Sequence, residues 1–169
     1  NYIKHIEEMG LPGREKPFYF MKPSDALVVV NPNKTCSISF PPETNNLHHE
    51  VELVIFISKE GQNLDVKEAK NIIFGCAVGL DMTRRDIQNI LREKKQPWEL
   101  AKAFDQSAPI GLIHPLETLG DITNLEITLS VNGEVKQKSN TNNMIFSACE
   151  LISDLSKYYK ILPGDLIFT

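Results

Sequence analysis

Several features that would assign this sequence to a specialised class of protein are missing from it. Its 169 residues include only three cysteines, Cys36, Cys76 and Cys149, and these show no paired spacing. An odd number of scattered cysteines argues against a disulfide scaffold and favours a reducing compartment. The longest apolar run, residues 72–80, contains two glycines. It falls well short of the roughly 20 residues that a membrane span needs.

Positive charge is also scarce. The 18 lysines and arginines are outnumbered by 22 aspartates and glutamates, which gives a net charge of −4. With no basic excess to neutralise phosphates, nucleic acid is not expected as a partner. The chain shows no internal repeat, no low-complexity segment and no visible targeting peptide. Its composition, 41% hydrophobic and 24% charged, is typical of a globular protein. We therefore expect a single domain over residues 1–169.

Strand patterns outnumber helix patterns along the chain. Residues 50–58 alternate polar and apolar side chains and then become fully apolar, which is the strongest strand signal. Residues 125–131 and 134–138 flank Asn132–Gly133, a dipeptide typical of a two-residue hairpin turn. Further strands are expected at residues 17–22, 26–30, 35–40 and 166–169, and helices at residues 1–9, 65–71, 147–159 and parts of 81–95. Residues 72–80 are apolar and β-branched at their start, and residues 99–104 fit either a strand or a helix. Because helices and strands do not alternate regularly, we expect a β-rich α+β fold.

Three acidic residues mark the ends of the two most apolar segments. Glu50 and Glu52 lie two apart on a strand and so point to one face, where two anions repel unless they share a proton or hold a cation. Asp81 ends the second apolar segment. Together they offer hard oxygen ligands suited to Mg²⁺, Mn²⁺ or Ca²⁺ rather than Zn²⁺. The alternative for the two glutamates is the solvated edge of an amphipathic strand.

Five other polar residues are candidates for chemistry. His5 and Glu8 are three apart on the expected first helix, and an imidazole beside a carboxylate is typical of a base that activates water. An exposed surface pair is the alternative. Lys102 stands in an apolar context, as a buried cation facing anions or as a surface group with a buried stem. Arg85 and Gln88 offer a carboxylate clamp and an amide donor, or ordinary surface polarity.

Seven segments in order resemble one known family. They read NYIKHIEEMG (1–10), FMKPSDAL (20–27), HHEVELVIFISK (48–59), GLDMTRRDIQ (79–88), PWELAKAFDQSAPIG (97–111), LSVNGEVKQKSNTNNMIFS (129–147) and LPGDLIFT (162–169). With these flanks the chain resembles the fumarylacetoacetate hydrolase family, and most closely its acylpyruvase and oxaloacetate decarboxylase branch. The resemblance covers essentially the whole chain.

The resemblance implies a fold and a metal site. The fold is a mixed β-sandwich roll of the fumarylacetoacetate hydrolase C-terminal domain type, usually assembled as a homodimer. Relatives have a strand before residue 1 and a Gly-Thr-Pro segment after residue 169, so we expect that this chain is incomplete at both ends. The divalent ion, generally Mg²⁺, is implied to bind Glu50, Glu52 and Asp81. Lys102 is implied to hold the substrate or its developing enolate.

The resemblance also implies roles on the substrate side. Arg85 and Gln88 match residues that face the substrate carboxylate. His5 and Glu8 match a pair on a mobile lid helix. Arg84 stands where many relatives have a small residue, and its larger side chain can narrow the pocket.

The implied activity is metal-assisted cleavage of a carbon–carbon bond in a short 2-oxo acid or 1,3-diketo acid. Acylpyruvate hydrolysis and oxaloacetate decarboxylation both fit, because both develop an enolate that the metal and Lys102 stabilise. An isomerase or tautomerase of 2-oxo acids such as oxaloacetate is the first alternative. A non-catalytic metal-binding dimer module is the second. Relatives are mitochondrial in many eukaryotes and cytoplasmic in bacteria, so either location is expected.

Overall fold

The computed structural model describes residues 1 and 16–169, and these residues divide into two compact units. The first unit comprises residues 1, 16–17, 53–77 and 113–169, and the second comprises residues 18–52 and 78–112. Strands β3 (Val51–Ile57) and β4 (Ile73–Leu80) each contribute residues to both units. Residues 2–9 of the expected first helix lie outside the described residues, and His5 and Glu8 with them.

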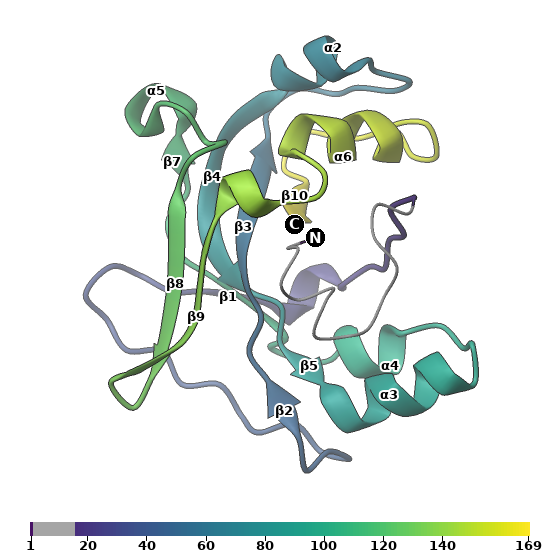
Figure 1. Cartoon of the computed structure of the whole chain (residues 1–169), viewed down its shortest axis with the longest axis vertical. Coiled ribbons are helices and arrows are strands. Elements are labelled where there is room, and N and C mark those ends of the chain that lie inside the picture. The colour runs from purple at the N-terminus through teal and green to yellow at the C-terminus, as the bar shows by residue number, and fades with distance from the viewer. Residues whose placement is uncertain (2–15) are drawn as a thin grey trace. The chain divides into compact units, whose positions relative to one another are not determined.

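The first unit contains most of the secondary structure. Its other strands are β7 (His114–Pro115), β8 (Glu126–Val131), β9 (Glu134–Asn140) and β10 (Leu166–Phe168), and its helices are α2 (Val66–Lys70), α5 (Leu116–Leu119), η2 (Thr141–Asn143) and α6 (Ala148–Leu155). Strand β10 pairs antiparallel with β3, and β7 with β4. Strands β8 and β9 form the long green hairpin of Figure 1. Asn132 and Gly133 make its turn with φ of 53° and 82°, which confirms the hairpin that the Asn-Gly pattern predicts.

The core of the first unit forms around β3. Its buried members are Leu53, Ile55, Ile57, Ala69, Ile72, Ile73, Cys76, Ala148, Ile152, Ile161 and Ile167. Val54, on the opposite face of the strand, is also fully buried. A strand that is buried on both faces reads as a continuous β-branched run rather than a strict alternation, which explains the apolar end of the 50–58 segment.

The two helices that pack together in this unit, α2 and α6, both begin with a capping box. At α2 the Asp65 carboxylate accepts the Glu68 backbone N–H at 2.7 Å, and Glu68 accepts the Asp65 N–H at 2.9 Å. At α6, Ser147 and Glu150 make the same reciprocal pair. Each box satisfies two of the free N–H groups at a helix start, which explains why these short segments are helical.

One close approach fixes where β7 meets β4. Gly75 pairs with Pro115, and a Cβ placed at Gly75 would lie only 2.1 Å from the backbone oxygen of His114. Only glycine fits such a contact. A glycine inside an apolar strand often marks a site where another backbone comes close, and Gly75 does so here.

The second unit is a smaller assembly of short elements. They are η1 (Ser24–Ala26), β1 (Leu27–Val29), β2 (Leu47–His48), β5 (Thr83–Arg84), α3 (Arg85–Glu93), α4 (Glu99–Lys102) and β6 (Ala108–Ile110). Strand β1 runs parallel to β6, β6 meets the end of β4 antiparallel at Gly79, and β2 pairs antiparallel with β5. Figure 1 shows α3 and α4 close together beside β5. The Asp86 carboxylate in α3 accepts from the Thr44 hydroxyl at 2.6 Å and the Asn45 N–H at 2.9 Å, which ties down the loop before β2.

Two expected strands are wrong. Residues 17–22 and 35–40 run as irregular chain, although both carry strand-like aromatic and β-branched residues. In each, apolar side chains stand exposed instead of packing into a core, as Phe18 at 63% and Phe40 at 65% show. The Ser39 N–H binds the Gln106 side chain at 2.7 Å rather than a neighbouring strand. Tertiary partners decide strand formation more than propensity does.

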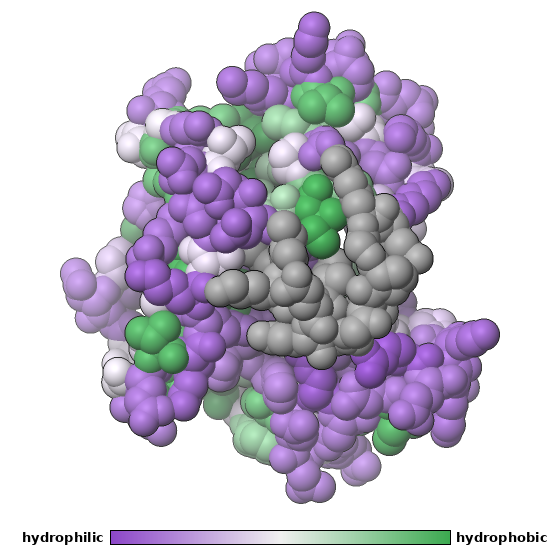
Figure 2. Space-filling model, in the orientation of Figure 1, coloured by the Kyte–Doolittle hydropathy of each residue, from purple (hydrophilic) through white to green (hydrophobic). Residues whose placement is uncertain are grey.

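Most of the other expected strands and helices are present, the short elements β2, β7 and α5 lie where none was expected, and the fold is a strand-rich mixture of α and β. Among the described residues, no helix combines the length and the apolar character needed to cross a membrane. Figure 2 shows that most residues visible on one face of the chain are hydrophilic, with hydrophobic residues scattered among them. Scattered exposed apolar residues are normal on protein surfaces.

Candidate metal centre

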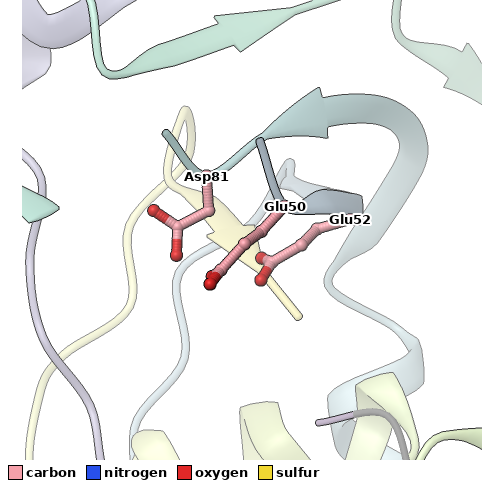
Figure 3. A group of neighbouring side chains, drawn as sticks. All are labelled: Glu50, Glu52 and Asp81. Atoms are coloured by element: carbon pink, nitrogen blue, oxygen red, sulfur yellow. The ribbon is translucent and has the colours of Figure 1, made fainter. Parts of the chain in front are cut away.

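Three carboxylates meet within the second unit, where the first residues of β3 lie beside the end of β4. Glu50 immediately precedes β3, Glu52 is its second residue, and Asp81 follows β4. The Asp81 N–H donates to the Glu50 backbone oxygen at 2.8 Å, which brings the two chain segments side by side. One carboxylate oxygen from each residue lies within 4.8 Å of the others. Figure 3 shows all three side chains turned to the same side of the backbone. The sequence expectation that these groups converge is confirmed.

Burial makes this cluster electrostatically unusual. Glu50 is 8% exposed and Asp81 only 2% exposed. Burial raises the pKa of the Glu52 carboxyl well above its usual range, and the negative charges of Asp81 and Glu50 raise it further, while Lys102 acts in the opposite direction. Two buried carboxylates and a partly buried one cannot all carry a negative charge side by side without a large energetic cost, so the cluster is suited to holding a cation.

A buried lysine faces two of these carboxylates. Lys102, the last residue of α4, is 2% exposed, and its ammonium lies 2.6 Å from a Glu50 oxygen and 2.5 Å from an Asp81 oxygen. It also donates to the Thr83 hydroxyl at 2.7 Å. Of the two readings that the sequence left open for Lys102, the buried cation facing anions is confirmed. All three ammonium donors have partners, a condition that a buried charge needs.

A second lysine, which sequence reasoning missed, approaches from the other side of Asp81. The Lys22 ammonium lies 2.8 Å from the second Asp81 oxygen, donates to the Met82 backbone oxygen at 3.2 Å, and also donates to the backbone oxygen of Lys102. Burial lowers the pKa of Lys22, although the Asp81 charge opposes this. The one sequence signal for Lys22 was its place in the family-like segment FMKPSDAL. A lone lysine before a proline belongs to no periodic pattern that would mark it as a site residue.

The structure brings Arg85 and Gln88 close to the Glu50 carboxylate. Both lie on α3, and the Arg85 guanidinium donates to a Glu50 carboxylate oxygen and to the Gln88 side-chain oxygen. Gln88 is 3% exposed. Arg85 also reaches His48, with 3.4 Å between its Nε and the imidazole Nδ1. Of the eight site residues expected from sequence, these two and Lys102 therefore surround the carboxylates, whereas His5 and Glu8 lie outside the described residues.

The donor set fits a hard divalent cation. The group consists of carboxylates alone, which suit Mg²⁺, Mn²⁺ or Ca²⁺, whereas Zn²⁺ prefers histidine and cysteine. The nearby His48 imidazole is engaged by Arg85. The raised pKa of Glu52 supports the same conclusion, because a bound cation offsets the repulsion among the three groups.

Comparisons with known proteins place the chain in one family. The family described as fumarylacetoacetate hydrolase, C-terminal, matches residues 1–169. A mitochondrial oxaloacetate decarboxylase of Dictyostelium discoideum is 40% identical over 169 residues, which is 100% of this chain and 76% of that protein. An oxaloacetate tautomerase of Escherichia coli is 39% identical over 170 residues, covering 100% of this chain and 76% of that protein.

A solved structure extends these similarities to three dimensions. Fumarylpyruvate hydrolase from Pseudomonas aeruginosa, in complex with Mn²⁺ and pyruvate, superposes with a TM-score of 0.96 and 46% identity, covering 99% of this chain and 72% of that one. The fold expected from the sequence resemblance is thereby confirmed. That structure also shows that a close relative binds a divalent metal together with a 2-oxo acid.

Proposed function

Because the chain belongs to the fumarylacetoacetate hydrolase family, we propose that it is a divalent-metal-dependent enzyme that cleaves a carbon–carbon bond in short 2-oxo acids. The proposed reactions are hydrolysis of acylpyruvates and decarboxylation of oxaloacetate. The observation that carries this proposal is the convergence of the Glu50, Glu52 and Asp81 carboxylates, with the Lys102 ammonium beside Glu50 and Asp81. The oxaloacetate decarboxylase and fumarylpyruvate hydrolase among its relatives support it.

The proposed cofactor is Mg²⁺, held by the three carboxylates, and Mn²⁺ fits the same ligands. When bound, the ion supplies a Lewis acid that polarises the 2-oxo group and favours negative charge on its oxygen. The Pseudomonas aeruginosa relative solved with Mn²⁺ supports a divalent metal in general. The preference for Mg²⁺ rests on the all-oxygen donor set.

The residues around the carboxylates supply fixed charge and orientation. Lys102 places a buried ammonium beside the position where the substrate oxygen gains negative charge, and such a preorganised charge acts strongly in a buried site. Arg85 carries a planar fork of donors that matches a carboxylate group, so we assign it to the substrate carboxylate. Gln88, bonded to the Arg85 guanidinium, sets its orientation.

The hydrolytic step needs a base for water. We assign this role to His5, with Glu8 fixing its tautomer and raising its basicity. The water oxygen bonds to the distal carbonyl carbon, and the bond from that carbon to the neighbouring CH₂ breaks. Its electron pair passes to the 2-oxo acid fragment, which leaves as pyruvate after it takes up a proton. In decarboxylation, the electron pair of the bond to the departing CO₂ passes to the same fragment.

A tautomerase is the second candidate, favoured by the similarity to the Escherichia coli oxaloacetate tautomerase. Enol–keto exchange moves one proton and needs no attacking water. A His5→Ala variant separates the two, since hydrolysis of acetylpyruvate requires an activated water and should fall sharply, whereas proton exchange in oxaloacetate survives if another base serves. Loss of hydrolysis with tautomerisation kept assigns His5 to water activation.

Two further proposals concern assembly and location. We propose a homodimer, supported by exposed aliphatic side chains in the sheet of the second unit, where Leu27, Val29 and Val78 are 36%, 58% and 52% exposed. Light scattering after gel filtration tests it, and a monomer at micromolar concentration would refute it.

We propose a mitochondrial or cytoplasmic location, in keeping with the mitochondrial relative from Dictyostelium discoideum.

The decisive experiment measures acetylpyruvate cleavage and oxaloacetate loss with and without EDTA, followed by return of Mg²⁺, Mn²⁺ or Ca²⁺. We expect EDTA to abolish both activities and Mg²⁺ or Mn²⁺ to restore them. A Glu52→Gln variant should lose several kcal/mol of transition-state stabilisation, about a hundredfold or more in rate. Glu93→Gln, at an exposed position on α3, is the matched control. Activity that survives EDTA would refute the metal role, and metal binding without any turnover would indicate a non-catalytic module.

A further inference from the structure

Lys102 lies on a helix that is too short to be stable without contacts to the rest of the protein. Helix α4 has four residues, Glu99–Lys102, and an isolated helix of this length is not stable in water. The Lys102 ammonium must nevertheless stay within hydrogen-bond distance of Glu50, Asp81 and Thr83. Contacts outside the helix must therefore fix its backbone.

Arg84 makes two of these contacts, one on each side of Lys102. Its guanidinium donates to the backbone oxygen of Leu100 at 2.9 Å and lies over the ring of Phe104, 4.6 Å from the ring centroid. Leu100 is two residues before Lys102, and Phe104 is two residues after it. One side chain thus spans the segment that carries the buried ammonium.

Both contacts have a clear physical basis. The last carbonyl groups of a helix have no partner within the helix, and the Leu100 oxygen is one of these. A cationic donor is a favourable partner at that end. The Phe104 ring is 8% exposed, so the cation–π contact is made close to the protein interior, where such contacts are strongest.

The position of Arg84 on β5 links the helix to the metal centre. Its neighbour Thr83 accepts a hydrogen bond from the Lys102 ammonium at 2.7 Å. Two consecutive residues of β5 therefore hold Lys102. The Thr83 hydroxyl contacts its ammonium, and the Arg84 guanidinium contacts the chain on either side of it. The Arg84 side chain contacts α4 and Phe104 just beyond its end. A small residue at position 84 could not make these contacts.

From this geometry we propose that Arg84 is a positioning residue that clamps the backbone of residues 100–104 and so holds the Lys102 ammonium at the metal centre. The link to turnover rests on the proposed function, while the clamp itself is testable without it. Loosening the clamp leaves the substrate ground state little affected and misplaces a charge needed in the transition state. We therefore expect an effect on kcat rather than on KM.

The test compares Arg84→Met, Arg84→Lys and the control Arg92→Met, which changes an exposed arginine on α3. The first readout is the rate of reductive methylation at Lys102, followed by peptide mass spectrometry. Lys102 is 2% exposed and should react slowly in the parent protein. We expect Arg84→Met to raise this rate about tenfold or more, Arg84→Lys to give an intermediate rate, and the control to leave it unchanged.

The second readout is kinetic, with acetylpyruvate and oxaloacetate as substrates. Because displacing a catalytic group by about 1 Å can cost about a hundredfold, we expect Arg84→Met to lower kcat by about tenfold to a hundredfold with KM within about twofold. The lysine variant should recover part of the loss. The titrated affinity for Mn²⁺ should change less in Arg84→Met than in Lys102→Met, because the ammonium is displaced rather than removed and the described contacts of Arg84 include none of the three carboxylates.

Each outcome has a distinct meaning. Unchanged methylation at Lys102 in Arg84→Met overturns the clamp. A uniform rise at all lysines in both variants indicates general loosening and overturns it as well. A selective rise at Lys102 in a protein that turns over neither substrate supports the clamp and refutes the proposed function instead.

Discussion

Replacing Lys102 by methionine tests the electrostatics of the candidate centre most directly. Methionine keeps an unbranched apolar stem of similar length and removes only the charge and its three donors. In the parent protein this ammonium contacts Glu50 at 2.6 Å and Asp81 at 2.5 Å. The variant therefore leaves two buried carboxylates without a shared cation.

The expected cost follows from the partners that remain. Removing one member of a buried ion pair typically costs about 3–5 kcal/mol, because the other charge stays buried and unpaired. Here Asp81 keeps Lys22 at 2.8 Å, and Glu50 keeps Arg85. We therefore expect a smaller loss of unfolding free energy, about 2–3 kcal/mol. For a chain of this size that corresponds to a drop in Tm of about 4–12 °C.

The assay is thermal unfolding in EDTA and again with Mn²⁺, with the exposed Lys94→Met as control. Because a bound cation restores positive charge among the carboxylates, we expect Mn²⁺ to raise the Tm of Lys102→Met more than that of the parent. A Tm within 1 °C of the parent in EDTA would show that the ammonium is not engaged as described. An equal response to Mn²⁺ in both proteins would show that Lys102 and the metal act on different groups.

Three further predictions concern other parts of the chain. Gly75→Ala should cost about 1–3 kcal/mol in urea unfolding, because its Cβ meets a β7 carbonyl at 2.1 Å, whereas Gly111→Ala, with its nearest neighbour at 3.5 Å, should be far milder. Hydrogen bonds from the Thr44 hydroxyl and from backbone N–H groups lower the pKa of Asp86, so its contribution to stability is full above the unfolded pKa of about 3.9 and is lost as pH falls through the lower folded value. The gap in urea stability between the parent and Asp86→Asn should accordingly narrow below about pH 4. Cys36 is exposed and should react first with a thiol reagent, while burial raises the pKa of the other two thiols and slows them.

The three carboxylates that the sequence predicted share one property, namely that strand geometry fixes them. Glu50 and Glu52 project to one face because side chains alternate along a strand, and Asp81 ends the next buried strand. Long apolar strands are the most dependable local signal, so the carboxylates at their ends could be placed together before the structure was known. The two failed strands, at residues 17–22 and 35–40, show the limit of this reasoning, since strand propensity cannot supply a partner.

Lys22 shows why the remaining part of the site escaped prediction. It lies in irregular chain, about sixty residues from Asp81, and no periodicity connects an irregular segment to a strand end. Only the packed structure reveals that its ammonium contacts the Asp81 carboxylate, the Met82 backbone and the Lys102 backbone at once. Its ammonium adds a third positive charge beside the carboxylates, next to those of Lys102 and Arg85, and so further offsets the repulsion among them. No local pattern in the sequence marks an irregular segment as the source of this charge, so the contribution of Lys22 follows from tertiary packing alone.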